Sequence, residues 1–143
     1  MLFGNDRDEL RQFYCDSWEK YQKNISLEPL EKQIVSVVQE HPEYHTLLEN
    51  ADKAKSREYF PEMNETNPFL HMSMHLGIRE QVSMNQPVGI GELLKVISLR
   101  EGEHEAEHKV MDCLAEVIMA AQAEQTAPDD KAYLECISAL VEA

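Results

Sequence analysis

Residues 67–84 read NPFLHMSMHLGIREQVSM, and this stretch decides the fold class. Asparagine followed by proline predicts a helix start, because asparagine caps the first turn and proline suits the first helical position. Apolar residues then recur at spacings of three and four, which is the period of an α-helix. His71 and His75 share one stripe of this helix with Ile78 and Val82. We therefore expect a buried, central helix.

On the N-terminal side the period is also helical. A helix is expected over about 6–23, with Asn5 as its cap, and a second from near Pro29. Pro42 predicts a break, because proline cannot donate a hydrogen bond to the preceding turn. A short helix through His45 should follow the break.

On the C-terminal side, a polar connection that is partly helical is expected over 49–66 and a loop over 85–91. This loop lacks the GK[ST] ending of a phosphate-binding loop, so no nucleotide site is expected. Further helices should end near Gly102, span about 103–125 and start near Pro128.

Strand-like alternation is nearly absent, and 143 residues fit one domain with a core of its own. The sequence therefore predicts an all-α protein with a single domain over residues 1–143. Its architecture should be an irregular helical bundle of about five to seven helices.

The charge limits the partners. The net charge is −14, with 13 basic and 27 acidic residues, so nucleic acid is not an expected partner.

The N-terminal sequence lacks the pattern of a signal peptide, and no apolar run reaches 18 residues, so no membrane span is expected. The three cysteines, Cys15, Cys113 and Cys136, form no CxxC motif, so we expect reduced thiols and a cytoplasmic protein.

The six histidines form three pairs with the same spacing, His41/His45, His71/His75 and His104/His108. Six histidines at a frequency of 6 in 143 predict roughly 0.25 such pairs by chance. Residues four apart lie on one face of a helix, so two imidazoles can hold one metal ion.

This spacing predicts a transition-metal site for zinc, iron or nickel. The expected ligands are His71, His75, His104 and His108, because both pairs begin stripes that continue apolar. His41 and His45 are additional candidates, since Pro42 makes the geometry of their pair the least regular. Catalytic residues and the reaction are left open, and no organic cofactor site is indicated.

Residues 104–108, HEAEH, match the H-E-x-x-H zinc motif, with Glu105 or Glu107 as the candidate base of a metal-dependent hydrolase. The motif is short, and no sheet edge is expected to align a substrate. E-x-x-H also occurs at Glu101/His104 and Glu105/His108, as in di-iron bundles, but the core stripes offer no clear further glutamates.

A competing hypothesis is a helical adaptor without enzymatic activity. In it the histidines satisfy buried backbone groups, and apolar helix faces bind a protein partner or a second copy of the chain. A contiguous exposed apolar patch would favour this alternative, and converging imidazole nitrogens would favour the metal site.

Several segments carry a family resemblance: HPEYH at 41–45, NPFLHMSMHLGIREQ at 67–81, QPVGI at 86–90 and HEAEHKVMDCLAEVIMAAQ at 104–122. Together they resemble the bacterial family called domain of unknown function 1841, over nearly the whole chain. The resemblance implies a small cytoplasmic bacterial protein whose characteristic segments contain the three histidine pairs. It implies no particular reaction, metal or substrate.

Overall fold

The computed structural model describes residues 6–143, and this range contains only helices and their connections. The α-helices are α1 Arg7–Gln22, α2 Pro29–Gln39, α3 His45–Leu48, α4 Ala51–Ser56, α5 Pro68–Met84, α6 Ile90–Glu101, α7 Glu103–Glu124 and α8 Asp130–Glu142; 3₁₀ turns occupy η1 Pro42–Tyr44 and η2 Pro61–Met63. The predicted all-α class is confirmed. The described residues form eight α-helices, a number close to the expected five to seven.

The chain divides into two compact units. Unit 1 comprises Met1–Leu76 and unit 2 comprises Gly77–Ala143, so the boundary falls within α5. The single domain over residues 1–143 stays a prediction.

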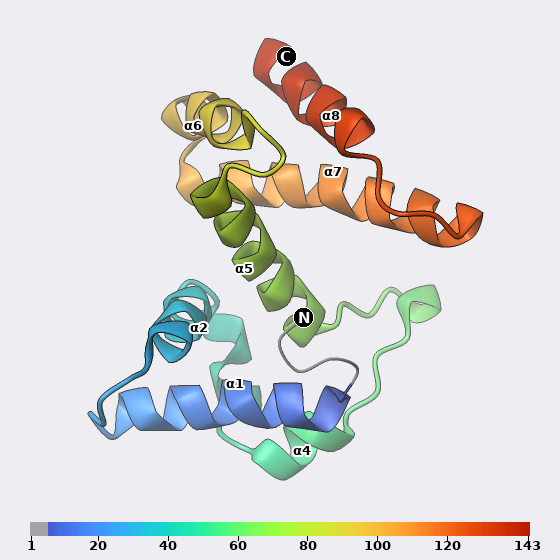
Figure 1. The fold of residues 1–143 in the computed structure, drawn as a ribbon. Helices are drawn as coiled ribbons and strands as arrows, with labels where there is room; N and C mark the ends of the chain where they lie inside the picture. Colours follow the sequence, from blue (N-terminus) through green and yellow to red (C-terminus); the bar gives the residue numbers. More distant parts are fainter. Residues whose placement is uncertain (1–5) are drawn as a thin grey trace. The chain divides into compact units, whose positions relative to one another are not determined.

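In unit 1, α1 packs against α2 and α4, as Figure 1 shows. The core includes Tyr14 and Trp18 from α1, Val37 and Val38 from α2, and Phe69 from the start of α5. The Tyr14 and Phe69 rings meet edge to face, with centroids 5.7 Å apart. This packing buries the apolar stripes that the helical period predicts.

A buried arginine joins α1 to the end of α4. Arg11 is only 2% exposed, and its Nη1 donates to the carbonyl oxygens of Ala54 at 2.9 Å and Arg57 at 2.7 Å. Its guanidinium also lies over the Phe69 ring, 4.9 Å from the centroid. Carbonyl groups at a helix C-terminus carry partial negative charge, which offsets the cost of burying this cation.

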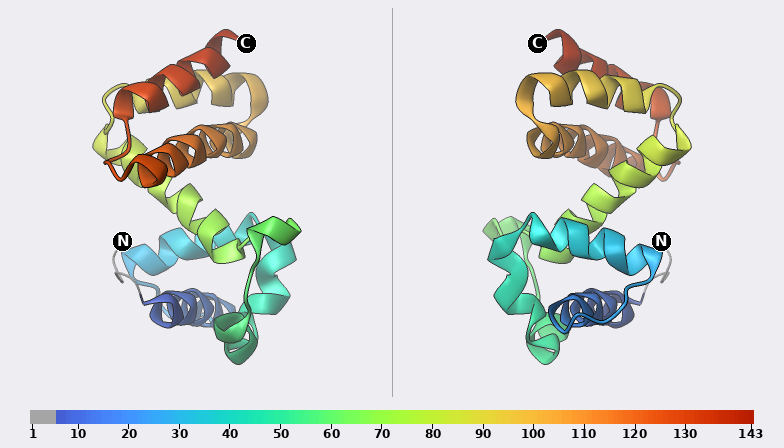
Figure 2. Two further views of the ribbon diagram at one scale, coloured as in Figure 1. Left: turned by 90° about the vertical axis from the view of Figure 1, so that its right-hand side faces the viewer. Right: turned by 90° about the vertical axis from the view of Figure 1, so that its left-hand side faces the viewer.

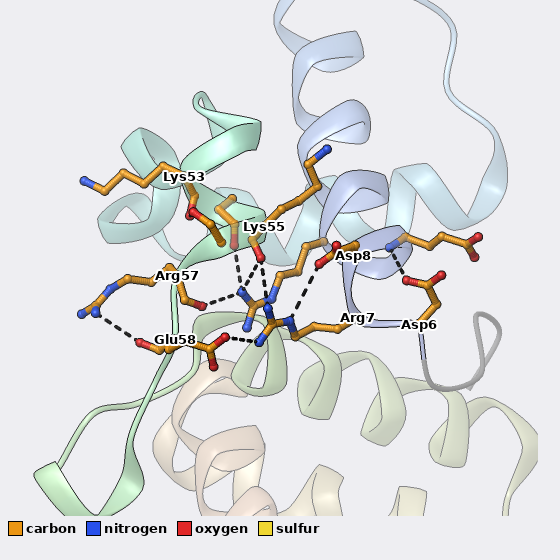
Figure 3. Close-up of polar contacts among 11 residues, drawn as sticks. Asp6, Arg7, Asp8, Lys53, Lys55, Arg57 and Glu58 are labelled. Carbon is orange, nitrogen blue, oxygen red and sulfur yellow. Dashed lines mark hydrogen bonds and ion pairs between the residues drawn. The ribbon is translucent and has the colours of Figure 1, made fainter.

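An exposed arginine reinforces the same junction. Arg7 reaches the Glu58 carboxylate at 2.9 Å and the Lys55 carbonyl oxygen at 3.4 Å, as the dashed lines in Figure 3 indicate. The side chains of Lys53 and Lys55 extend from the same junction. Arg7 and Arg11 therefore tie α1 to the end of α4.

In unit 2, α7 packs against α6 and α8, and α6 packs against α8 (Figure 2). Arg100 on α6 donates to three carbonyl oxygens at the end of α8: Leu140 at 2.7 Å, Val141 at 3.0 Å and Ala143 at 3.2 Å. Near the start of α8, the Tyr133 hydroxyl donates to Gln81 Oε1 at 2.8 Å. These bonds hold α8 at both ends.

Unit 2 also contains a disulfide, Cys113–Cys136, which joins α7 to α8 with a Cα–Cα distance of 5.8 Å. The expectation that all thiols are reduced is therefore wrong for this pair. The two residues are 23 positions apart and become neighbours only because α7 and α8 pack together. Cys15 is a free, buried thiol, and burial raises its pKa to about 11.

The expected helix ends are mostly confirmed. Asn67 Oδ1 accepts hydrogen bonds from the backbone amides of Phe69 and Leu70, so it caps α5 as predicted. Asp6 caps α1 by accepting from Glu9 N at 3.0 Å, whereas the expected cap Asn5 lies outside the described residues.

The last two helices differ from expectation in detail. α8 begins at Asp130 rather than near Pro128, because the Asp129 carboxylate caps it. The buried face of α7 also lies elsewhere. Its buried residues are Ala106, Glu107, Val110, Met111, Cys113, Val117 and Ala121. The expected stripe headed by His104 and His108 is only half-buried, because packing against two helices determines which face is covered.

Among the described residues, no helix is both long and apolar enough to cross a bilayer.

Candidate metal centre

Unit 1 gathers three histidines into one cluster. The ring centroids of His41 and His75 are 4.8 Å apart, and His71 lies 5.0 Å from each of them. His71 and His75 are four residues apart on α5, which places both rings on one face. His41 belongs to the break between α2 and η1, where Pro42 begins the 3₁₀ turn. The break thus brings a third imidazole to the predicted helical pair.

The tautomer of His41 follows from one hydrogen bond. Its Nδ1 lies 2.8 Å from the Val37 carbonyl oxygen, which can only accept, so Nδ1 carries the hydrogen. In a neutral ring the lone pair is then on Nε2, the nitrogen that can bind a metal. Metal-binding histidines commonly donate their other ring N–H to a carbonyl or carboxylate, which fixes the ring orientation. His41 is 2% exposed, and its surroundings therefore hold the ring in one place.

His45 has a different role from that of its partner in sequence. Its Nε2–H donates to the Val38 carbonyl oxygen at 2.9 Å. Its ring lies against Trp18, with centroids 4.4 Å apart. The structure therefore uses His45 to pack α3 against α1, although the sequence included it among the candidate ligands.

Unit 2 contains the third pair. His104 and His108 lie on the first turns of α7, and their ring centroids are 4.2 Å apart. Both rings are half-buried. Their closeness confirms that the spacing of four brings the two imidazoles together, as the helical geometry requires.

Four described histidines each offer a ring nitrogen that could hold a metal ion: His41 and His75 in unit 1, and His104 and His108 in unit 2. Within each of these two pairs the ligand nitrogens lie no more than 4.8 Å apart. Two nitrogens at such a separation can approach one ion at the usual Zn–N length of about 2.0–2.1 Å with small side-chain adjustments.

The two glutamates of the HEAEH segment differ sharply. Glu107 is 8% exposed and pairs with Arg79, whose Nε lies 3.0 Å and Nη2 3.2 Å from the carboxylate oxygens. This bidentate ion pair stabilises the ionised form of Glu107, and Arg79 contacts both of its carboxylate oxygens. Glu105 is exposed. Of the two candidate bases, only Glu105 is therefore open to solvent.

The E-x-x-H pair at Glu101/His104 receives little support. Glu101 forms ion pairs with Lys109 and Arg100, and the hydrogen bond from Lys109 is the main cause of its lowered pKa. A carboxylate held by two cations is a poor candidate for the bridging ligand of a di-iron site.

The family comparison fits these positions. The family described as "Domain of unknown function (DUF1841)" matches residues 6–139. The chain belongs to the DUF1841 family. The match covers the unit 1 cluster of His41, His71 and His75 and the pair His104 and His108 on α7. It confirms the family resemblance of the sequence. No curated protein and no solved structure matches the chain significantly.

Sequence reasoning ranked the histidines differently from the structure. It placed His41 and His45 together as optional ligands, whereas the structure assigns His41 to the cluster and His45 to packing. The signal in the sequence was Pro42, which ends the helical register between the two residues. The spacing of four is therefore helical for two pairs and not for the first.

Proposed function

We propose that this DUF1841 protein binds transition metal through two groups of histidines, each taken by itself: His41, His71 and His75 in unit 1, and His104 and His108 in unit 2. The observation that carries the proposal is the cluster in unit 1, where the centroids of three imidazole rings lie no more than 5.0 Å from one another. Three imidazoles so close together would repel one another when protonated, whereas as neutral bases they bind a shared cation.

The chemistry of the donors indicates the class of metal. Imidazole nitrogen suits Zn²⁺, Fe²⁺, Ni²⁺ and Cu²⁺, whereas Mg²⁺ and Ca²⁺ prefer oxygen ligands. The net charge of −14 also enriches cations near the surface, although it does not select among them. We therefore propose zinc, iron or nickel as the ion and exclude the alkaline-earth ions.

His45 is the least suitable of the six histidines as a ligand. Its ring packs on Trp18, whereas the three rings of the unit 1 cluster pack on one another. We therefore propose His45 as a structural residue and as the control position for the experiment.

The location of the protein in the cell and its partners are separate proposals from the metal site. A cytoplasmic location agrees with the family resemblance, but the Cys113–Cys136 disulfide weighs against it, because stable disulfides form mainly in oxidising compartments. A protein partner or a second copy of the chain stays a prediction, as does the lack of nucleic-acid binding.

Calorimetric titration of the full chain with Zn²⁺ tests the proposal. The chain is first stripped with a chelator, and the wild type is compared with His75→Ala, His104→Ala and the control His45→Phe. We expect saturable binding in the wild type, weakening of at least about tenfold in the two alanine variants and little change in the control. A wild type that takes up no Zn²⁺, Fe²⁺ or Ni²⁺, or alanine variants that bind like the wild type, would refute the proposal.

A further inference from the structure

The ring of Tyr44 covers two histidines of the unit 1 cluster. It stacks on His41 with an interplanar angle of 7° and centroids 5.4 Å apart. It also meets His71 edge to face, with centroids 6.3 Å apart and an angle of 75°. Tyr44 thus contacts one imidazole through its face and another near its edge.

The local backbone explains this position. Tyr44 is the last residue of the 3₁₀ turn η1, and its amide donates to the carbonyl oxygen of His41 at 3.0 Å. His41 is the N-cap of this turn, and the turn brings the rings at positions 41 and 44 face to face.

The Tyr44 ring forms one wall of the histidine cluster. The side chain is half-buried, so it also keeps solvent from one side of the two imidazoles.

We propose that Tyr44 is a positioning residue for the metal site, which holds the His41 and His71 rings in their binding orientation and keeps the coordination number of the bound ion low. This inference rests on the proposed function, because it concerns the same ligands. A flat ring against His41 restricts the rotation that the hydrogen bond to Val37 allows. It also excludes water molecules that would otherwise complete a larger coordination shell.

Cobalt reports on both effects. Co²⁺ replaces Zn²⁺ in imidazole sites, and four-coordinate Co²⁺ absorbs visible light much more strongly than six-coordinate Co²⁺. The full chain is titrated with Co²⁺ as the wild type, Tyr44→Phe, Tyr44→Leu and Tyr44→Ala. The control is Tyr21→Ala, which removes a different stacked ring of unit 1, the one that lies 5.3 Å from Trp18.

We expect Tyr44→Phe to match the wild type, because the ring rather than the hydroxyl is needed. Tyr44→Ala should weaken Co²⁺ binding by about 10- to 100-fold and shift the spectrum towards the weak absorption of higher coordination. Tyr44→Leu keeps most of the apolar volume but not the flat ring, so it should show the same spectral shift even if the alanine variant folds poorly.

The outcomes separate this inference from the proposed function. If the wild type binds no Co²⁺ or Zn²⁺, the proposed function itself fails. If the wild type binds and Tyr44→Leu retains its affinity and spectrum, only the role of Tyr44 is refuted. A loss of affinity in Tyr21→Ala equal to that in Tyr44→Ala would also refute it, because any loss of aromatic packing would then suffice.

Discussion

The Nδ1–H group of His41 donates a hydrogen bond to the carbonyl oxygen of Val37, 2.8 Å away. This bond joins the C-terminal turn of α2 to the histidine cluster of unit 1. Val37 is fully buried, so the backbone that orients His41 is itself fixed by the core. The arrangement resembles that of metal-binding histidines in general, whose second nitrogen is anchored by an acceptor.

Replacement of His41 by phenylalanine should separate ring packing from ligation. The new ring can still stack on Tyr44, but it has no nitrogen to bind a metal or to donate to Val37. We expect Zn²⁺ affinity to fall by at least about tenfold, measured by competition with a chromophoric chelator. Unchanged affinity would show that His41 is not a ligand.

Arg11 should contribute strongly to the stability of unit 1. Arg11→Met keeps much of the packing but leaves the carbonyl oxygens of Ala54 and Arg57 without this donor. We expect the free energy of unfolding in urea to fall by about 2–4 kcal/mol. The control Arg7→Ala removes an exposed ion pair at the same junction and should have a much smaller effect. Equal effects of the two substitutions would contradict the account.

The Cys113–Cys136 disulfide closes a loop with a sequence separation of 23. A cross-link of this length should stabilise the chain by about 3 kcal/mol, mainly by restricting the unfolded state. We expect the Cys113→Ala/Cys136→Ala variant to unfold at lower urea, and a reductant to shift the wild type towards it. The control Cys15→Ala, which leaves the disulfide intact, should still respond to reductant. A wild type insensitive to reductant would count against a bonded pair.

Ionisation of the buried Tyr14 should lower the stability of unit 1 at alkaline pH. Burial raises the pKa of Tyr14 to about 12, although the hydrogen bond with Ser73 opposes this shift. A raised folded-state pKa stabilises the protein fully below about pH 10, the unfolded value, and this stabilisation is lost as pH rises towards 12. We expect the free energy of unfolding to fall by up to about 3 kcal/mol more over this interval in the wild type than in Tyr14→Phe. Parallel pH profiles for the two proteins would rule out this role.

The elements that sequence predicts well are those with local causes. Asn67 and Pro68 determine the start of α5, and Pro42 determines the break after α2, because capping and the missing proline amide act within a few residues. The pairing of His71 with His75 follows from the helical period in the same way. Such features require no knowledge of distant parts of the chain.

Other features depend on contacts between distant segments, and the sequence did not reveal them. The separate roles of His41 and His45 arise because α1 places Trp18 beside His45, whereas α5 brings His71 and His75 to His41. The face of α7 that is buried depends on α6 and α8, and so does the closeness of Cys113 to Cys136. No spacing along the chain encodes these neighbours.

Elemental analysis of the untagged protein tests the central claim most directly. Inductively coupled plasma mass spectrometry would compare the wild type with a His71→Ala/His108→Ala variant, which removes one imidazole from each group. We expect a near-stoichiometric transition metal in the wild type and little in the variant. A wild type that contains no metal even after exposure to Zn²⁺, Fe²⁺ and Ni²⁺ would contradict the account and favour a helical adaptor with structural histidines.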